Sequence, residues 1–411
     1  MPSLTARSGL NWLNFFTAAA QTGFGPFVAV YLTERGWSQT DIGVALSIGT
    51  AAGLISQVPG GVLVDFVHRK QRLTAAALLL LGVSALALIG WPTQDLVWAS
   101  QVLHAAATGI LVPAIAALTL ALYGHDAFSA RLGVNSRYQS LGNALAAGLL
   151  GVVASYLSNR AVFALTAVLV IPALLALSTI RPEHYAEPND DHPSMQHPRV
   201  LRQRPHRPWH IFRVTSLHIF AVCTVLFHLS NAAMLPLALN ALAKRTNNTG
   251  LVVSAAIIVP QIVAALIAPW IGRAAQRFGR RPLLVAGFLA LPLRGLLLAA
   301  LPDAVPLALM QSLDGVSAAV LAIMVPLVAA DLTRGTGYLN LAIGWFGLAA
   351  NIGATVSTTL AGLVADRLGI PTALVGLTMV GFAATLLLWR TLPETRPAAR
   401  RVKTRPSPMA A

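Results

Sequence analysis

The sequence predicts an all-α membrane protein with twelve transmembrane helices in two pseudo-symmetric six-helix bundles. Three observations support this fold class. The 411 residues are 56% hydrophobic and only 10% charged, whereas soluble proteins carry about 25% charged residues. Apolar runs of about 20 residues recur along the chain, long enough for a helix to cross the hydrocarbon core of a bilayer. The two halves of the chain also match each other at an offset of about 210 residues.

The expected spans follow one another with short polar connectors. The first run, Leu10 to Thr33, exceeds the apolar core of a cleavable signal peptide and lacks its small-residue cleavage site. The expected ranges are 10–33, 42–64, 73–92, 96–123, 138–157, 161–180, 214–240, 250–272, 282–301, 304–330, 338–365 and 370–390.

The basic residues set the expected orientation. Most of the 29 lysine and arginine residues fall in the connectors on one side if the N-terminus is cytoplasmic. An excess of positive charge in cytoplasmic loops is the usual rule, so we expect both termini in the cytoplasm of a bacterium and the spans in its inner membrane. The same pattern explains the net charge of +15 without a nucleic-acid partner.

One long polar stretch divides the chain into domains. Residues 181–213 are rich in proline, histidine and arginine, which is typical of a linker. The expected domains are a six-helix bundle at 1–180, a cytoplasmic linker at 181–213, a second bundle at 214–392 and a disordered basic tail at 393–411.

Metal sites and cofactors are not expected. The single cysteine, Cys223, allows neither an intrachain disulfide nor a cysteine metal cluster. The linker holds several histidines, but their irregular spacing does not match a metal-site pattern. They are His184, His192, His197, His206 and His210.

Two related basic motifs follow the second and eighth expected spans. The first contains Gly61, Asp65, Arg69 and Lys70. The second keeps a glycine and the basic residues but has Gln276 where the first has an acid; its members include Gly272, Arg277, Gly279 and Arg280.

On these motifs, with six spans, a basic linker and six more spans, the whole chain resembles the major facilitator superfamily. The first copy departs from the family pattern at Phe66 and His68, and the second at Gln276. Two further signatures are missing, namely the arginine of span four and the Gly-Pro-x-x-Gly-Gly pattern of span five. The resemblance therefore points to a bacterial subfamily of unassigned substrate.

The resemblance implies that Asp65 faces the cytoplasmic start of span eleven. A helix N-terminus there would favour an anion, and the contact would hold the cytoplasmic side closed. Alternatively, the basic residues of these motifs only set topology. The gating candidates are Gly61, Asp65, Arg69, Gly272, Arg277, Gly279 and Arg280.

The resemblance also implies that spans 1, 4, 7 and 10 line a central cavity. Each of these spans carries polar residues three or four positions apart, which places them on one helix face. Polar side chains are costly against lipid and far less so in a wet cavity, although they also join helices together. The candidates are Asn14, Gln21, Gln101, His104, Thr108, His228, Asn231, Gln311 and Asp314.

Asp314 is the one acid well inside an expected span. An aspartate at the membrane centre costs about 2.5–3.5 kcal/mol, so a partner is expected. His104 is its repeat mate, and pairing with it would favour a role for Asp314 and His104, or His228, in carrying a coupling proton. Arg294 lies at a similar depth in the neighbouring span, and an Arg294–Asp314 pair would be mainly structural. Both alternatives stay open.

These features predict a proton-coupled exporter of a small organic solute that works by alternating access as a monomer. The runner-up is a proton-coupled importer of a sugar or organic acid. The chain has no phosphate-binding P-loop. It also lacks the clustered carboxylates or nucleophile motif of an intramembrane enzyme. A sensor of this fold that binds ligand without moving it is a further alternative.

Overall fold

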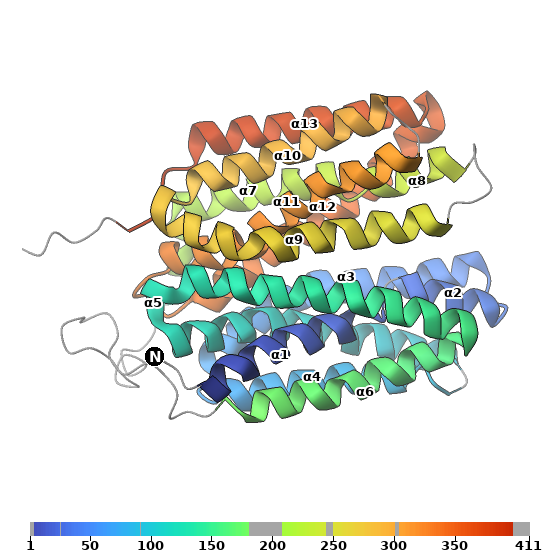
Figure 1. The fold of residues 1–411 in the computed structure, drawn as a ribbon, viewed down its shortest axis with the longest axis horizontal. Coiled ribbons are helices and arrows are strands. Elements are labelled where there is room, and N and C mark those ends of the chain that lie inside the picture. The colour runs from blue at the N-terminus through green and yellow to red at the C-terminus, as the bar shows by residue number, and fades with distance from the viewer. Residues whose placement is uncertain are drawn as a thin grey trace, which may run out of the picture.

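The computed structural model describes residues 4–24, 26–90, 92–180, 208–243, 250–300 and 304–397. Across these ranges the regular structure is helical, and no strand occurs in them. Figure 1 shows the helices in two layers, with the first half of the chain below and the second half above.

The described part of the first half contains six helices: α1 (Leu4–Thr22), α2 (Pro26–Glu34), α3 (Gln39–Phe66), α4 (Lys70–Leu86), α5 (Gln94–Tyr156) and α6 (Asn159–Ser178). The second half begins with a 3-10 helix, η3 (Pro208–Arg213). It continues with α7 (Thr215–Asn231), α8 (Met234–Ala243), α9 (Gly250–Phe278), α10 (Arg281–Ala300), α11 (Ala304–Leu332), α12 (Leu339–Leu368) and α13 (Ile370–Thr391).

The predicted all-helical membrane fold is confirmed. Ten helical segments in the described ranges are long and apolar enough to cross a membrane. One of them, α5, has 63 residues and covers two expected spans, while α4 has 17 residues. The count of twelve spans therefore stays a prediction.

Residues 124–137 differ from expectation. We expected a connector between spans four and five, but helix resumes directly after a single non-helical residue, Gly124 (φ 64°, ψ 177°). Glycine adopts positive φ without steric cost, so the chain turns there within one residue. As a consequence Arg131, expected in a loop, is a buried residue of α5.

The two halves meet along two seams. Seam one is the contact of α3 with α12, where glycines allow the backbones to touch. A β-carbon on Gly61 would lie 2.1 Å from the carbonyl oxygen of Asn340, and one on Gly344 would lie 2.2 Å from that of Gln57.

Seam two is the contact of α5 with α9, and it repeats this arrangement. A β-carbon on Gly272 would lie 2.6 Å from the carbonyl oxygen of Ser129, and one on Gly133 would lie 2.5 Å from that of Ala268. Each of these four residues is 211 positions from its counterpart in seam one. The internal repeat therefore extends to the packing between the halves.

These contacts occur at one end of the bundle only. We call it the closed end; it is where α3 ends and α12 begins. Glycines nearer the other end of the same helices have nothing within 4 Å of an added β-carbon. They are Gly43 and Gly53 on α3, Gly148 and Gly151 on α5, and Gly362 on α12.

Candidate functional site

A cavity of about 330 Å³ lies between the halves, lined by α1, α3 and α5 from one half and α7, α11 and α12 from the other. Most of its wall is aliphatic, with Phe346 as an aromatic member. None of the described residues that line it is an aspartate, glutamate, lysine or arginine. Its polar residues are Asn14, Gln57, Asn135, Ser136, Gln139, Thr224 and His228.

Of the expected cavity residues, Asn14 and His228 line this space. The other seven do not, because the cavity lies nearer the closed end than their helical turns. On α11, for example, the lining begins at Leu321, seven residues past Asp314, which is about 10 Å along the axis. The residues outside the wall are Gln21, Gln101, His104, Thr108, Asn231, Gln311 and Asp314.

Sequence reasoning missed four polar lining residues. Gln57 was overlooked on α3, and Asn135, Ser136 and Gln139 lie on the part of α5 near the expected connector. Their spacing of one, three and four positions is the usual signal of one helix face. This face becomes visible in the sequence when the fifth span is predicted to begin at residue 125 instead of 138.

Asp314 pairs with Arg294. The Nη1 of Arg294 contacts the Oδ1 of Asp314, and its Nη2 donates to the Oδ1 of Asn231 at 2.6 Å. The Oε1 of Gln311 lies 3.5 Å from Nη1. The Arg294 side chain is 2% exposed and that of Asp314 is 24% exposed. The pair therefore offsets a buried charge while leaving part of the carboxylate reachable.

His104 does not meet Asp314 through any contact found in the described ranges. Its ring instead stacks on Phe24, with centroids 3.8 Å apart, and its buried Nδ1 has no hydrogen-bond partner. Gln101, one turn away, packs on Gly49 and has an unpartnered Nε2. Of the two partners considered for Asp314, the structure shows Arg294 in contact with it.

Two further cavity candidates lie outside the wall. Gln21 is half-buried on α1, and Thr108 donates to the carbonyl of Ala105 at 2.9 Å, a bond inside its own helix. The gating candidate Arg69 is exposed before the start of α4.

Asp65 lies where the resemblance implied, at the start of α12. Its Oδ1 accepts hydrogen bonds from the backbone N–H of Asn340 at 3.0 Å and from the side-chain Nδ2 at 2.7 Å. Its Oδ2 accepts from the backbone N–H of Leu341 at 2.8 Å. One carboxylate of the first half thus satisfies donors at a helix N-terminus of the second half.

The second motif copy makes a different set of contacts. Gln276 donates to the backbone carbonyl of Asp126 across seam two. Gly279 has φ +92°, which ends α9 and turns the chain into α10. The side chain of Arg277 packs on the ring of Phe278, 5.3 Å from its centroid, and both residues are exposed.

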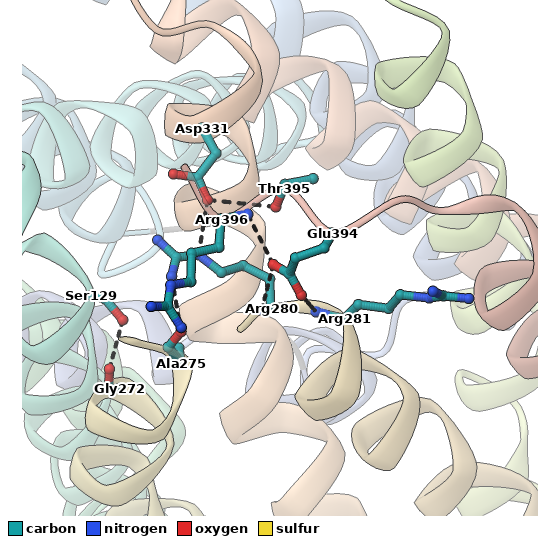
Figure 2. A network of polar contacts seen from close by, with 9 residues as sticks. All are labelled: Ser129, Gly272, Ala275, Arg280, Arg281, Asp331, Glu394, Thr395 and Arg396. Carbon is teal, nitrogen blue, oxygen red and sulfur yellow. Dashed lines mark hydrogen bonds and ion pairs between the residues drawn. The ribbon is translucent and has the colours of Figure 1, made fainter. Parts of the chain in front are cut away.

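Residues after α13 bind to this turn, as Figure 2 shows. Glu394 accepts hydrogen bonds from the backbone N–H groups of Arg280 and Arg281 at 2.8 and 3.0 Å. Arg280 forms an ion pair with Asp331 at 2.9 Å, and Arg396 donates to the carbonyl of Arg277 at 3.0 Å.

The tail expected to be disordered from residue 393 is therefore ordered at its start. Residues 393–397 are held by the α9–α10 turn, and the rest of the tail lies outside the described residues. Partial burial would raise the pKa of the Glu394 carboxyl, but the N–H donors of Arg280, Arg396 and Arg281 outweigh it and lower that pKa. The linker at 181–207, including four of its histidines, also lies outside the described residues.

No group of three or more histidine, cysteine, aspartate or glutamate side chains in the described ranges could hold a metal ion. The architecture is thus two helical bundles around a largely apolar cavity, closed at one end, with a charged pair beside it in the second half.

Comparisons with known proteins agree with this architecture. The Major Facilitator Superfamily model matches residues 10–227 and 220–410. An uncharacterised MFS-type transporter of Mycobacterium tuberculosis strain CDC 1551 is 33% identical over 99% of this chain and 97% of its own length, and a protein of strain H37Rv matches equally. The chain belongs to the major facilitator superfamily, and it is a membrane transporter, not an enzyme.

Solved structures share the fold at low identity. The proton:xylose symporter XylE has a TM-score of 0.70 at 14% identity, over 96% of this chain and 95% of that one. The human organic anion transporter MFSD10 has a TM-score of 0.71 at 16% identity, over 94% and 100%. The Escherichia coli fucose:proton symporter FucP has a TM-score of 0.69 at 15% identity, over 94% and 98%.

Proposed function

We propose that this transporter exports a small organic solute in exchange for protons, by alternating access of the cavity between its two halves. The observation that carries the proposal is the arrangement of the seams. Both close around glycines at one end, while glycines nearer the other end of the same helices face open space. Rocking one half on the other would exchange these two ends.

The closed end is the cytoplasmic end in this proposal. The loop α3–α4 and the loop α9–α10 lie there and carry Arg69, Lys70, Arg280 and Arg281. Basic loops face the cytoplasm in membrane proteins. The conformation is then outward-facing, in a bacterial inner membrane, with both termini in the cytoplasm and the monomer as the working unit.

The contacts of Asp65 act as the cytoplasmic latch. Three hydrogen bonds to one ionised carboxylate at a helix N-terminus stabilise the closed end in this state. Around seam two, Gly272, Gly279 and Arg280 hold the α9–α10 turn in position.

Proton coupling is assigned to Asp314, with Arg294 as the partner that releases it. The Asp314 carboxylate contacts the buried guanidinium of Arg294, so the oxygen in this contact becomes available to a proton when the pair separates. Movement between outward- and inward-facing states supplies such a change. His104, with a buried and unpartnered Nδ1, is the second candidate for a proton site.

Export is preferred over import because the cavity wall is mainly aliphatic and holds a single aromatic residue, Phe346. Such a wall suits solutes with an apolar frame. The alternative, a proton-coupled importer of a sugar or organic acid, is favoured by the names of XylE and FucP as sugar:proton symporters.

The test compares metabolites in the medium and inside cells that express the wild type or Asp314→Asn, by untargeted mass spectrometry. We expect at least one compound to be enriched in the medium with the wild type only. Enrichment inside the cells would instead establish import. Asp366→Asn is the matched control, because Asp366 is exposed at the end of α12.

A double variant separates coupling from stability. Asp314→Asn alone leaves a buried, unpaired Arg294, which typically costs about 3–5 kcal/mol. Arg294→Gln with Asp314→Asn removes both charges and restores the fold. Recovery of pH-dependent transport in the double variant would show that the pair is structural; a folded protein without pH dependence supports the coupling role.

A further inference from the structure

Two arginines at the closed end of the first half carry positive charge without a described counter-ion. Arg131 lies on α5 and is 7% exposed, and Arg7 is half-buried near the start of α1. Among the described residues, neither of them forms an ion pair with a carboxylate. Charged side chains are almost never fully buried unless they are paired, so the charge of Arg131 calls for an explanation.

The partners that Arg131 does have are neutral. Its Nη2 donates to the Oδ1 of Asn11 at 2.5 Å, and its guanidinium packs over the ring of Tyr123, 5.1 Å from the centroid. Arg7 lies one helical turn from Asn11, on the same face of α1. Its positive charge acts against that of Arg131. The neutral contacts hold the side chain of Arg131 in place but leave two like charges near each other.

Each of these two arginines also has N–H groups that are unused and reachable by water. The Nη1 of Arg131 bonds to no described residue, and only the Nε of this side chain is both unpartnered and fully buried. The same holds for Arg7, where Nε is the buried nitrogen and the two Nη groups are open. Because a guanidinium has donors and no acceptor, a partner for these groups must supply acceptor atoms.

Asn11 adds a donor of fixed direction. Its Oδ1 is occupied by the N–H of Arg131, and an arginine only donates, so the other end of the amide is the NH₂ group. The three neighbours therefore offer positive charge and hydrogen-bond donors together, which is the chemistry that recognises an anion.

The three residues lie between the cavity and the end of the bundle. α1 begins at the closed end, so Arg7 is near the surface there (Figure 1). Arg131 is one turn from the lining residue Asn135, toward the closed end. None of Arg7, Asn11 and Arg131 lines the cavity. An anion held by them would be bound apart from the solute cavity.

We infer that Arg7 and Arg131, with Asn11 as a further donor, bind a phosphate group at the closed end of the first half. A guanidinium matches phosphate oxygens with two parallel N–H groups, and a phosphate has enough oxygens to accept from both arginines. The phosphate comes either from solution or from the headgroup of a phospholipid. Its charge would neutralise two cations beside Ser129 and Gly133, the residues of α5 in seam two. This site goes beyond the proposed export and does not depend on it.

The experiment measures the unfolding temperature of the purified full-length protein in a maltoside detergent, which contains no phosphate, because a ligand of the folded state raises that temperature. The probes are sodium phosphate, sodium chloride at equal ionic strength, and dihexanoyl phosphatidylglycerol, with dihexanoylglycerol as the lipid that lacks the phosphate. We expect a saturable rise with the two phosphate-bearing probes only. Saturation at a lower concentration of the phosphatidylglycerol identifies a lipid headgroup as the ligand, and saturation at a lower concentration of sodium phosphate identifies the soluble ion.

Variants assign the rise to this site. Arg131→Gln should abolish the saturable rise, and Arg7→Gln should weaken binding of the better probe by about tenfold, the loss expected for a charged hydrogen bond. Arg137→Gln is the matched control, because Arg137 is exposed on the same helix and the charge change is the same. Phosphate also stabilises proteins by exclusion from their surfaces, so the comparison is between Arg131→Gln and Arg137→Gln.

An equal rise in Arg131→Gln and Arg137→Gln would overturn the inference, as would an equal rise with chloride or the absence of a rise with either phosphate-bearing probe. The half-buried Arg7 provides the same comparison if Arg131→Gln does not fold: a rise in Arg7→Gln that saturates at the wild-type concentration rejects the site. The probes are tested without transport, so a failure of the export proposal leaves this result unchanged.

Discussion

The two copies of the basic motif occupy equivalent places in the two halves but make different contacts. In seam one, Asp65 crosses between the halves and receives three hydrogen bonds at the start of α12. In seam two, Gln276 donates to the backbone carbonyl of Asp126, and the hydroxyl of Ser129 donates to that of Gly272 at 2.6 Å. The polar groups beside it are engaged within their own half, by Glu394 and Asp331.

The close backbone approach is common to both seams, while the charge is not. Glycines at equivalent positions bring the helices together in each seam. The repeat has therefore kept its packing and changed its polar chemistry. Seam one combines packing with three hydrogen bonds to a carboxylate, and seam two combines packing with neutral hydrogen bonds from Gln276 and Ser129.

The largest effect on access to the cavity should come from a steric clash in seam one. In Gly344→Val the new side chain would collide with the backbone of Gln57, 2.2 Å from the added β-carbon. We expect seam one to stay open. A cysteine introduced as Ser136→Cys, in a Cys223→Ser background, should react at least tenfold faster with an impermeant maleimide applied from the closed side.

The control for this prediction is Gly362→Val, on the same helix, where nothing lies within 4 Å of the added β-carbon. It should label at the wild-type rate. Slow labelling of Gly344→Val would mean that the contact of α3 with α12 does not determine access.

Removing the latch charge comes next. Asp65→Ala removes three charge-assisted hydrogen bonds, each with a net contribution of about 1.5–3 kcal/mol in favourable settings. We expect the same labelling rate to rise, by less than in Gly344→Val but by more than a few-fold. Asp65→Asn, which keeps one acceptor oxygen, should fall between the wild type and the alanine variant; equal rates for all three would remove the latch.

The equivalent change in seam two should have a smaller effect. Gln276→Ala loses one neutral hydrogen bond, about 0.5–1.5 kcal/mol, so a labelling change of a few-fold is expected. An effect as large as that of Asp65→Ala would mean that both seams carry comparable polar latches and that the comparison fails.

Sequence alone was sufficient for the membrane fold, and the family resemblance implied that Asp65 faces the start of α12. Apolar runs of the right length force helices in lipid, and the motif with its spacing placed Asp65 at the end of α3. Pairing of Asp314 was not decided by sequence, because His104 and Arg294 lie at similar expected depth and only packing chooses between them.

The residues that line the cavity were harder to predict from sequence, for a different reason. Asn135 and Ser136 fall near Arg131 and Arg137, and this basic composition indicates a connector. The chain instead turns at Gly124 and forms helix at once, burying Arg131. Charge near a membrane surface predicts topology better than it predicts where a helix begins.

The smallest effect is expected from the contact of Glu394 with the α9–α10 turn, which lies within the second half. The hydrogen bonds to Glu394 lower its pKa below the ordinary value of 4.5. A lowered carboxyl pKa stabilises the folded protein above that value, and the stabilisation is lost as the pH falls through the folded pKa. Glu394→Gln should therefore reduce the unfolding temperature slightly at pH 7, because Glu394 is exposed, and match the wild type at low pH.

Thermal unfolding in nanodiscs between pH 3 and pH 7 measures this difference, with Arg390→Gln, an exposed position near the end of α13, as the charge-change control. If Glu394 acts only within its half, Glu394→Gln leaves the labelling rate through seam one unchanged. A faster rate at pH 7 would instead show that the contact of the segment after α13 with the α9–α10 turn also stabilises seam one. The two motif copies would then act together as one latch.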